Sequence, residues 1–171
     1  MAEAVIVDAV RTPIARGKPI VGDLNGFHAA ELLALSIREV VQRSGVGFED
    51  IEYLAGGCVT QAGEQSSNVT RTAWLSMDEG YFPGATTLDN QCGSAQTANH
   101  ILSSMITTGG LDIGIACGVE SMSRVPMGSN VYNGPGTYQP ENWPWDTIPT
   151  QFVHAERIAH KRGRTREMLE A

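Results

Sequence analysis

The sequence contains only three cysteines, and their spacing argues against two kinds of site. Cys58, Cys92 and Cys117 are odd in number, far apart and without a Cys-x-x-Cys pair. A disulfide framework uses an even number of cysteines, and a structural zinc site uses closely spaced pairs, so neither is expected. Reduced thiols fit a nucleophile.

Long apolar runs and nucleotide-binding loops are also absent. No run approaches the roughly 20 apolar residues that a membrane-spanning helix needs, and the N-terminus shows neither a basic leader nor a small-residue cleavage site. No Gly-x-Gly-x-x-Gly follows a predicted strand, and no phosphate loop with Gly-Lys-Ser or Gly-Lys-Thr is present. We therefore expect a cytoplasmic protein with no membrane span and no nucleotide site of these two types.

Basic residues are scarce as well. Lysine and arginine total 12 against 19 aspartates and glutamates, and the formal net charge of −7 argues against nucleic acid as a partner. The balance reverses from His154 onward, where five basic residues accompany three acidic ones. Such a patch can meet phosphates, but a solvated helix face is the simpler explanation for most of these side chains. Glu156 and His160 are four residues apart and fit a local helix pair better than a metal site, so no metal is expected.

Strand-like and helix-like patterns alternate along the chain. The strand-like ranges are 4–10, 51–60, 85–88 and 111–117, and the helix-like ranges are 31–43, 67–77 and the segment from Cys92 to Gly109. Ser44-Gly45 ends the first helix, and Ser66 or Ser67 is the expected cap of the second. This order predicts an α/β fold with a mostly parallel sheet and helices on both faces.

Cys92 stands where the third predicted strand turns into the third predicted helix. We expect Asp89 or Asn90 to cap this helix and Cys92 to fall in its first turn. Free backbone N–H groups and the helix dipole there favour a thiolate, and the same N–H groups can stabilise an oxyanion. The small residues 93–95 leave room for a substrate carbonyl. On this chemistry alone, a small, buried and inert cysteine is an equally good explanation.

Three segments together resemble the thiolase family. Residues 89–96, Asp-Asn-Gln-Cys-Gly-Ser-Ala-Gln, are similar to the family's nucleophile segment, Asn-Arg-x-Cys-x-Ser-Gly-x-Gln-Ala. Residues 10–14 resemble the end of its opening strand, and residues 118–123 resemble its Gly-Gly-x-Glu-Ser-Met-Ser turn. Two departures surround the cysteine: Asp-Asn replaces Asn-Arg, and Ala95 replaces a glycine. Similar variants occur in degradative actinobacterial thiolases that act on bulky substrates such as steroid side chains.

The resemblance implies the N-terminal part of a thiolase. Residues 1–123 would form its mostly parallel, mixed α/β domain, and residues 124–171 would begin a truncated loop domain that covers coenzyme A, with an ordered loop excursion at 127–149. The implied activity is acyl transfer: cleavage of 3-ketoacyl-CoA by coenzyme A, or the reverse Claisen condensation, in fatty acid or steroid degradation. Cys92 would be the acyl-accepting nucleophile, and its backbone N–H an oxyanion donor. Coenzyme A would be a substrate, with no covalently bound cofactor.

The resemblance also implies partners for this chain. Thiolases form homodimers or homotetramers, and they use a histidine and a second cysteine from a carboxyl-terminal half. None of the four histidines lies in a segment that matches the family's histidine motif: His28, His100, His154 and His160. We therefore expect residues 1–171 alone to be inactive. Two alternatives stay open: a ketoacyl-synthase-like condensing enzyme, which the turn at 120–123 disfavours, and a non-catalytic thiolase-like module that binds coenzyme A or lipid.

Overall fold

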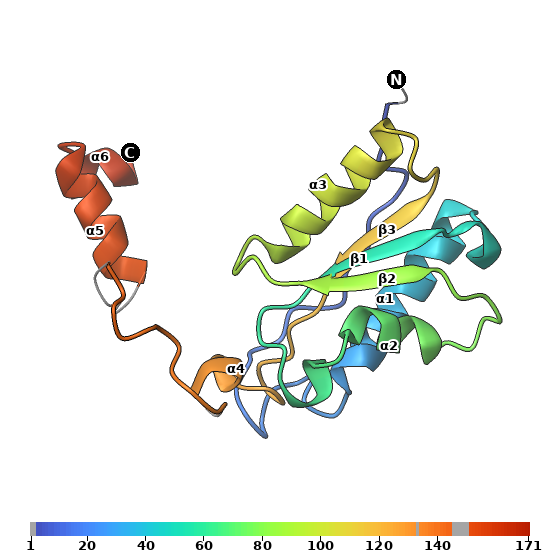
Figure 1. Ribbon diagram of the computed structural model, residues 1–171, viewed down its shortest axis with the longest axis horizontal. Helices are drawn as coiled ribbons and strands as arrows, with labels where there is room; N and C mark the ends of the chain where they lie inside the picture. The colour runs from blue at the N-terminus through green and yellow to red at the C-terminus, as the bar shows by residue number, and fades with distance from the viewer. Residues whose placement is uncertain (1–2, 133, 145–150) are drawn as a thin grey trace. The chain divides into compact units, whose positions relative to one another are not determined.

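The described chain forms two compact units. The computed structural model describes residues 3–132, 134–144 and 151–171, and its units are Met1–Gly134 and Pro135–Ala171 (Figure 1). Two helices lie in the second unit, α5 (Gln151–Lys161) and α6 (Arg166–Glu170). The predicted excursion at 127–149 is described in part, since residues 133 and 145–149 lie outside the described ranges. The assignment of residues 124–171 to a domain that covers coenzyme A stays a prediction.

Three parallel strands form the described sheet, in the order β2-β1-β3 (Figure 1). They are β1 (Tyr53–Gly57), β2 (Gly84–Leu88) and β3 (Gly114–Gly118). β1 is central, so that Leu54 stands opposite Ala85 on one side and Ile115 on the other. Each strand overlaps a predicted range, which confirms the parallel α/β fold. No antiparallel strand occurs within the described ranges.

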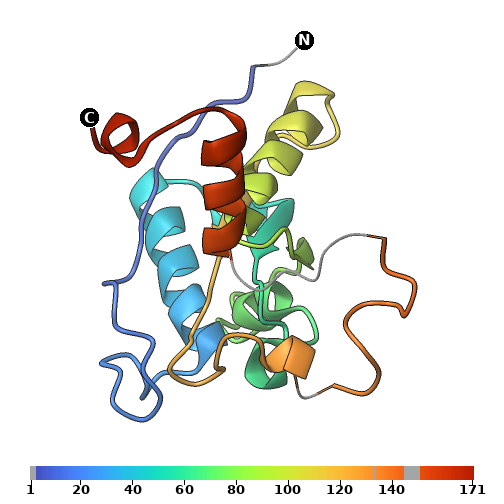
Figure 2. The same cartoon turned by 90° about the vertical axis from the view of Figure 1, so that its left-hand side faces the viewer.

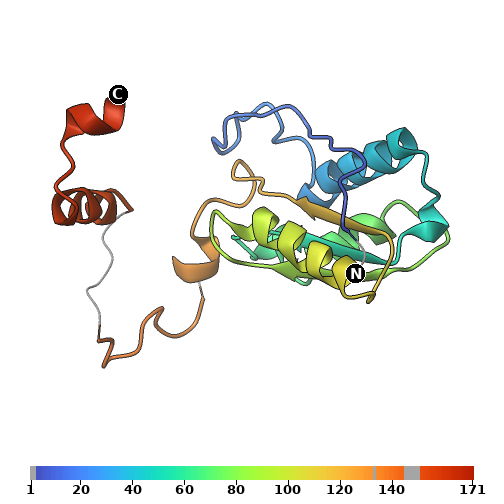
Figure 3. The same cartoon turned by 90° about the horizontal axis from the view of Figure 1, so that it is seen from above.

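Helices cover both faces of the sheet because neighbouring strand residues point to opposite sides. α1 (Ala29–Ser44) and α2 (Val69–Leu75) share a core with Leu54, while α3 (Ser94–Thr107) shares a second core with Ala55. Figure 3 shows α1 and α3 on opposite sides of the strands. The shorter helices are η1 (Phe48–Asp50), η2 (Gly63–Gln65) and α4 (Ser129–Tyr132). None of the helices in the described part of the chain is long and apolar enough to cross a membrane.

Local side-chain chemistry decides where the first two helices begin and end. α1 ends at Gly45, whose φ of 72° is the left-handed conformation that glycine adopts readily, as predicted. The predicted caps of α2, Ser66 and Ser67, are wrong. Asn68 caps it instead, because its side chain accepts a hydrogen bond from the Arg71 N–H. Its φ of 65° suits asparagine, which tolerates the left-handed region better than most residues.

The first predicted strand, residues 4–10, is not part of the sheet. Figure 2 shows this segment as an extended chain alongside α1, to which Arg43 links it through an ion pair with Asp8 at 3.0 Å. Val5, Ile6 and Val7 are 72%, 83% and 70% exposed. The apolar pattern is that of a strand, but a strand also needs a hydrogen-bonded neighbour, and the described residues supply none. The segment and β3 instead line one groove of about 900 Å³.

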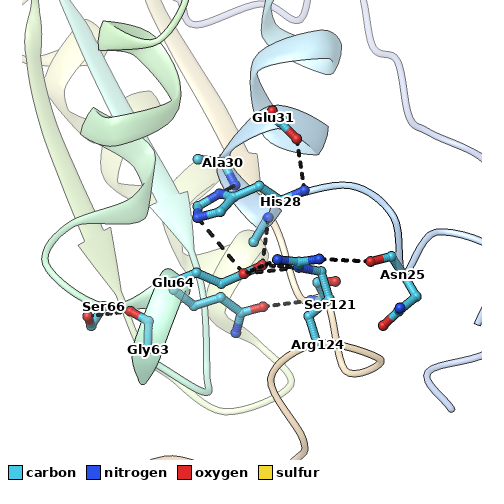
Figure 4. Close-up of polar contacts among 11 residues, drawn as sticks. Asn25, His28, Ala30, Glu31, Gly63, Glu64, Ser66, Ser121 and Arg124 are labelled. Carbon is cyan, nitrogen blue, oxygen red and sulfur yellow. Dashed lines mark hydrogen bonds and ion pairs between the residues drawn. The ribbon is translucent and has the colours of Figure 1, made fainter. Parts of the chain in front are cut away.

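An ion-pair cluster around Glu64 joins the loops after β1 and β3 to the start of α1 (Figure 4). Arg124 donates from Nε and Nη2 to the Glu64 carboxylate, both at 2.8 Å, and from Nη1 to the Asn25 carbonyl at 2.9 Å. The Ala29 N–H donates to Glu64 at 3.0 Å, and His28 Nε2 lies 3.9 Å from it. The hydrogen bonds from Arg124 are the main cause that lowers the pKa of Glu64 below its ordinary value of 4.5.

We expect Glu64→Gln to remove a pH-dependent part of the stability. Because the native pKa of Glu64 is lowered, the ionised carboxylate stabilises the fold fully above pH 4.5. That contribution is lost as the pH falls through the lowered pKa. The wild-type advantage in free energy of unfolding, measured by urea denaturation, should therefore be constant near neutrality and shrink below about pH 4. Glu39→Gln, at an exposed position on α1, should show no such dependence; an equal pH profile for Glu64→Gln and wild type would contradict the assignment.

Candidate active site around Cys92

The turn that carries Cys92 links the end of β2 to the start of α3. β2 ends at Leu88 and α3 begins at Ser94, with Gly93 as the N-cap residue. Cys92 therefore lies two residues before the helix, and its predicted place in the first helical turn is wrong. The side chain is exposed, so the alternative of a buried and inert cysteine is not supported.

The predicted caps of α3, Asp89 and Asn90, are also wrong. Asp89 Oδ1 accepts a hydrogen bond from the Gln91 N–H at 2.8 Å, inside the turn. The Asn90 side chain donates to Thr97 Oγ1 at 2.8 Å. Both side chains thus stabilise the turn before the helix. The sequence pattern does not reveal the extra turn between strand and helix, so it places the cap too early; the N-cap residue is Gly93, which makes no side-chain cap hydrogen bond.

Gln91 gives this turn its shape. Its φ is 49°, a left-handed backbone conformation that costs of order 1–3 kcal/mol for a residue other than glycine. A strained turn between a strand and a helix is also how serine hydrolases expose their nucleophile above a sheet. The next residue here is Cys92, which is exposed. The strained turn at Gln91 therefore leaves the Cys92 side chain open to solvent at the end of β2.

Two glycines let the start of α3 lie directly against the sheet. A Cβ on Gly57 would be 2.4 Å from the Ala95 nitrogen, and a Cβ on Gly118 would be 3.3 Å from the Ala95 Cβ. The Cβ added to Gly118 would also lie 2.9 Å from the Gly57 carbonyl oxygen. Side chains at either position would push α3 outward and displace the turn that carries Cys92. Gly118 was part of a predicted motif, whereas Gly57 was not singled out.

The other two cysteines are chemically different from Cys92. Cys58 is buried just after β1, and desolvation, followed by the charge of Glu120, raises its pKa to about 12. Cys117 lies in β3, and desolvation raises its pKa to about 12. Both therefore remain thiols near neutral pH. Of the three, Cys92 alone is exposed.

A second hydrogen-bond network fixes the turn after β3. The Glu120 carboxylate accepts from the Val59 N–H at 2.9 Å, the Thr60 N–H at 3.3 Å and Gln65 Nε2 at 2.9 Å. Gln65 is 0% exposed, and its Oε1 accepts from the Ser121 N–H at 2.7 Å. The turn is thus held on the loop after β1. Sequence reasoning missed Gln65, because a polar residue in a short, non-periodic segment gives no signal of burial.

The histidines of the first unit do not form a catalytic pair with Cys92. His28 caps α1, and His100 lies on α3, whereas His154 and His160 lie on α5 in the second unit. Among the described residues of Met1–Gly134, no hydrogen bond or ion pair joins His28 or His100 to Cys92. The described residues of the whole chain also contain no group of three His, Cys, Asp or Glu side chains that could hold a metal ion.

Known proteins match nearly the whole chain. Residues 4–171 fit the family model described as thiolase, N-terminal domain. The chain is 35% identical to steroid 3-ketoacyl-CoA thiolase FadA6 of Mycobacterium tuberculosis, over 99% of this chain and 43% of that protein. It is 34% identical to a 3-ketoacyl-CoA thiolase of Shigella sonnei, over 100% of this chain and 43% of that protein.

A solved structure shows the same fold. Acat5 thiolase from Ascaris suum, in complex with coenzyme A, matches with a TM-score of 0.72 and 24% identity, over 97% of this chain and 44% of that chain. The chain thus spans less than half the length of these relatives. The matched family model and the motifs around Cys92 and Gly118 agree on one identity: this chain belongs to the thiolase family and corresponds to its N-terminal domain.

Proposed function

We propose that this chain is the N-terminal part of a thiolase in which Cys92 is the acyl-accepting nucleophile. The observation that carries the proposal is the exposure of Cys92 on a strained turn, whereas Cys58 and Cys117 have raised pKa values. Two relatives are named 3-ketoacyl-CoA thiolases, which supports 3-ketoacyl-CoA as the substrate class. The structural neighbour is a complex with coenzyme A, which supports coenzyme A as the second substrate.

The proposed reaction has two steps. The Cys92 thiolate attacks the 3-keto carbon, the bond between C2 and C3 breaks, and C2 takes a proton as acetyl-CoA leaves. The thiol of coenzyme A then attacks the acyl-cysteine, and the bond between the acyl carbon and the Cys92 sulfur breaks. This releases a shortened acyl-CoA and leaves Cys92 as a thiol. Covalent catalysis thereby divides one difficult cleavage into two easier steps. In both steps, the backbone N–H of Cys92 is the proposed oxyanion donor.

A bulky acyl chain is our narrower hypothesis for the substrate. It is supported by the relative named as a steroid thiolase and by the Asp89-Asn90 and Ala95 departures next to the nucleophile. The 34% identity to an enzyme named only as a 3-ketoacyl-CoA thiolase supports the broader class, which includes fatty acyl chains. The three free thiols favour a reducing compartment, and we propose the cytoplasm.

We further propose that catalysis requires a carboxyl-terminal half. β3 is an edge of the described sheet, and it lines a groove of about 900 Å³ with the exposed segment that contains Val5, Ile6 and Val7. A strand returning from the second half would pair with β3 and cover this apolar segment. The same half would supply the histidine and the second cysteine, neither of which accompanies Cys92 among the described residues of Met1–Gly134.

The opposite edge of the sheet supports a proposed dimer. β2 is the strand that leads to Cys92, and it is the other edge of the described sheet. Its residues Gly84 and Thr86 are exposed. Pairing of β2 with its copy across a two-fold axis would satisfy the unpaired backbone groups of both strands.

We predict that iodoacetamide at neutral pH modifies Cys92 at least about 100-fold faster than Cys58 or Cys117. The reason is that Cys92 is exposed, whereas the pKa values near 12 leave the other two thiols almost entirely protonated. Peptide mapping by mass spectrometry after brief alkylation measures the three rates. In the unfolded protein the three rates should become similar. Faster modification of Cys58 or Cys117 in the folded protein would rule out Cys92 as the nucleophile.

Purified 1–171 should show no coenzyme A-dependent cleavage of a 3-ketoacyl-CoA. General acid–base catalysis is worth about 10²–10⁴-fold, and no histidine is bonded to Cys92 among the described residues of Met1–Gly134. Co-expression with the complementary half should restore turnover, and Cys92→Ala in that complex should abolish it. Turnover by 1–171 alone would refute the half-enzyme proposal. A complex that binds coenzyme A and does not turn over would favour the non-catalytic module.

The complex of residues 1–171 with the carboxyl-terminal half should sediment as a dimer or a larger species of that complex at micromolar concentration. Thr86→Asp places two like charges near the proposed two-fold axis, and like charges opposite each other destabilise strand pairing. We expect this variant to shift the equilibrium toward monomer. Gln42→Asp, at an exposed position on α1, serves as the matched control and should not. Sedimentation of the wild-type protein as a monomer would contradict the dimer proposal.

A further inference from the structure

Ser94 connects both sides of the turn that presents Cys92. Its Oγ donates a hydrogen bond to the Gln91 carbonyl at 2.6 Å and accepts one from the Asn90 N–H at 2.9 Å. Its backbone N–H also donates to the Gln91 carbonyl, at 3.0 Å. Ser94 is only 4% exposed, so water competes little for these bonds. One hydroxyl therefore satisfies the backbone on both sides of the peptide that joins Asn90 to Gln91.

These bonds fall on the strained residue. Gln91 has a φ of 49°, which residues other than glycine rarely adopt without support. Its carbonyl receives two hydrogen bonds from Ser94, and its N–H donates to Asp89. Cys92 follows immediately, so the direction of its side chain depends on the conformation of Gln91.

We propose that Ser94 is a positioning residue: its hydroxyl holds Gln91 in the left-handed conformation and thereby aims the Cys92 thiol. Ser94 acts through the backbone in this role. The inference rests on the proposed nucleophilic role of Cys92, and it adds the residue that orients the Cys92 thiol for that role. Sequence reasoning had counted Ser94 only as a small neighbour.

The space around Ser94 explains why a serine is suited to this position. A Cβ on Gly57 would lie 2.8 Å from the Ser94 Cβ, so strand β1 passes close to this side chain. A larger residue has little room there. Alanine fits, but it leaves the Asn90 N–H without its hydroxyl partner and removes one of the two bonds to the Gln91 carbonyl. The position thus requires a side chain that is both small and able to donate and accept.

The test uses the full-length protein and the rate of Cys92 alkylation by iodoacetamide, measured by peptide mapping from about pH 6 to about pH 10. We expect Ser94→Ala to lower the limiting rate at high pH by about tenfold or more, because a misdirected thiolate is misdirected at every pH. Ser104→Ala is the matched control. Ser104 is a serine of the same helix, its Oγ donates to the His100 carbonyl at 2.8 Å, and its removal should leave the rate unchanged.

A second-site variant separates positioning from general packing. Glycine adopts positive φ without strain, so Gln91→Gly should restore most of the alkylation rate in the Ser94→Ala background. An unchanged rate in Ser94→Ala would overturn the proposal. A reduced rate that Gln91→Gly does not restore would also overturn the proposal. This holds if Cys58 stays protected from alkylation, and it holds if Cys58 becomes reactive because the fold has opened. An unreactive Cys92 in the wild-type protein would instead overturn the proposed nucleophile and, with it, the basis of this inference.

Discussion

The close approach of α3 to the sheet is the constraint on which the rest of the site depends. Gly57 in β1 and Gly118 in β3 lack the side chains that would hold the helix away, and Ala95 occupies the space. This packing buries Ser94 and leaves Cys92 outside the core, two residues earlier in the chain. The position of Cys92 thus depends on the absence of side chains at two neighbouring strand positions as much as on its own helix.

Hydrogen bonds and an ion pair hold together the loops that follow the strands of this sheet. In a parallel sheet the carboxyl ends of the strands meet at one edge, so the loops after β1 and β3 come together there. Gln65 and Glu120 join these two loops through buried and partly buried hydrogen bonds, and Glu64 and Arg124 join them again through an ion pair. Two networks from adjacent residues of one short helix, η2, therefore fix the loops after β1 and β3 to each other.

The three cysteines show how environment decides the chemistry of one residue type. Cys58 and Cys117 are placed where desolvation disfavours the charged thiolate, and their pKa values rise to about 12. Cys92 lies in the turn between β2 and α3, and it is exposed. The two edge strands of the described sheet also differ: β2 leads to Cys92, while β3 borders the groove that the segment at 4–10 also lines. Each of these strands pairs only with β1 among the described strands.

The sequence by itself determined the alternation of strands and helices from α1 to β3 and the family, and it singled out Cys92 as the candidate nucleophile. Hydrophobic periodicity and helix-ending residues are local properties of the sequence, so strands, helices and the end of α1 at Gly45 can be predicted from them. Tertiary structure decided the rest. An apolar run at 4–10 carries no information on whether a neighbouring strand is present to bond with it, and Gln65 shows its burial only once its partners converge. The left-handed Gln91 precedes Cys92, and the hydroxyl of Ser94 that bonds to the backbone on both sides of this turn is buried only once α3 packs on the sheet.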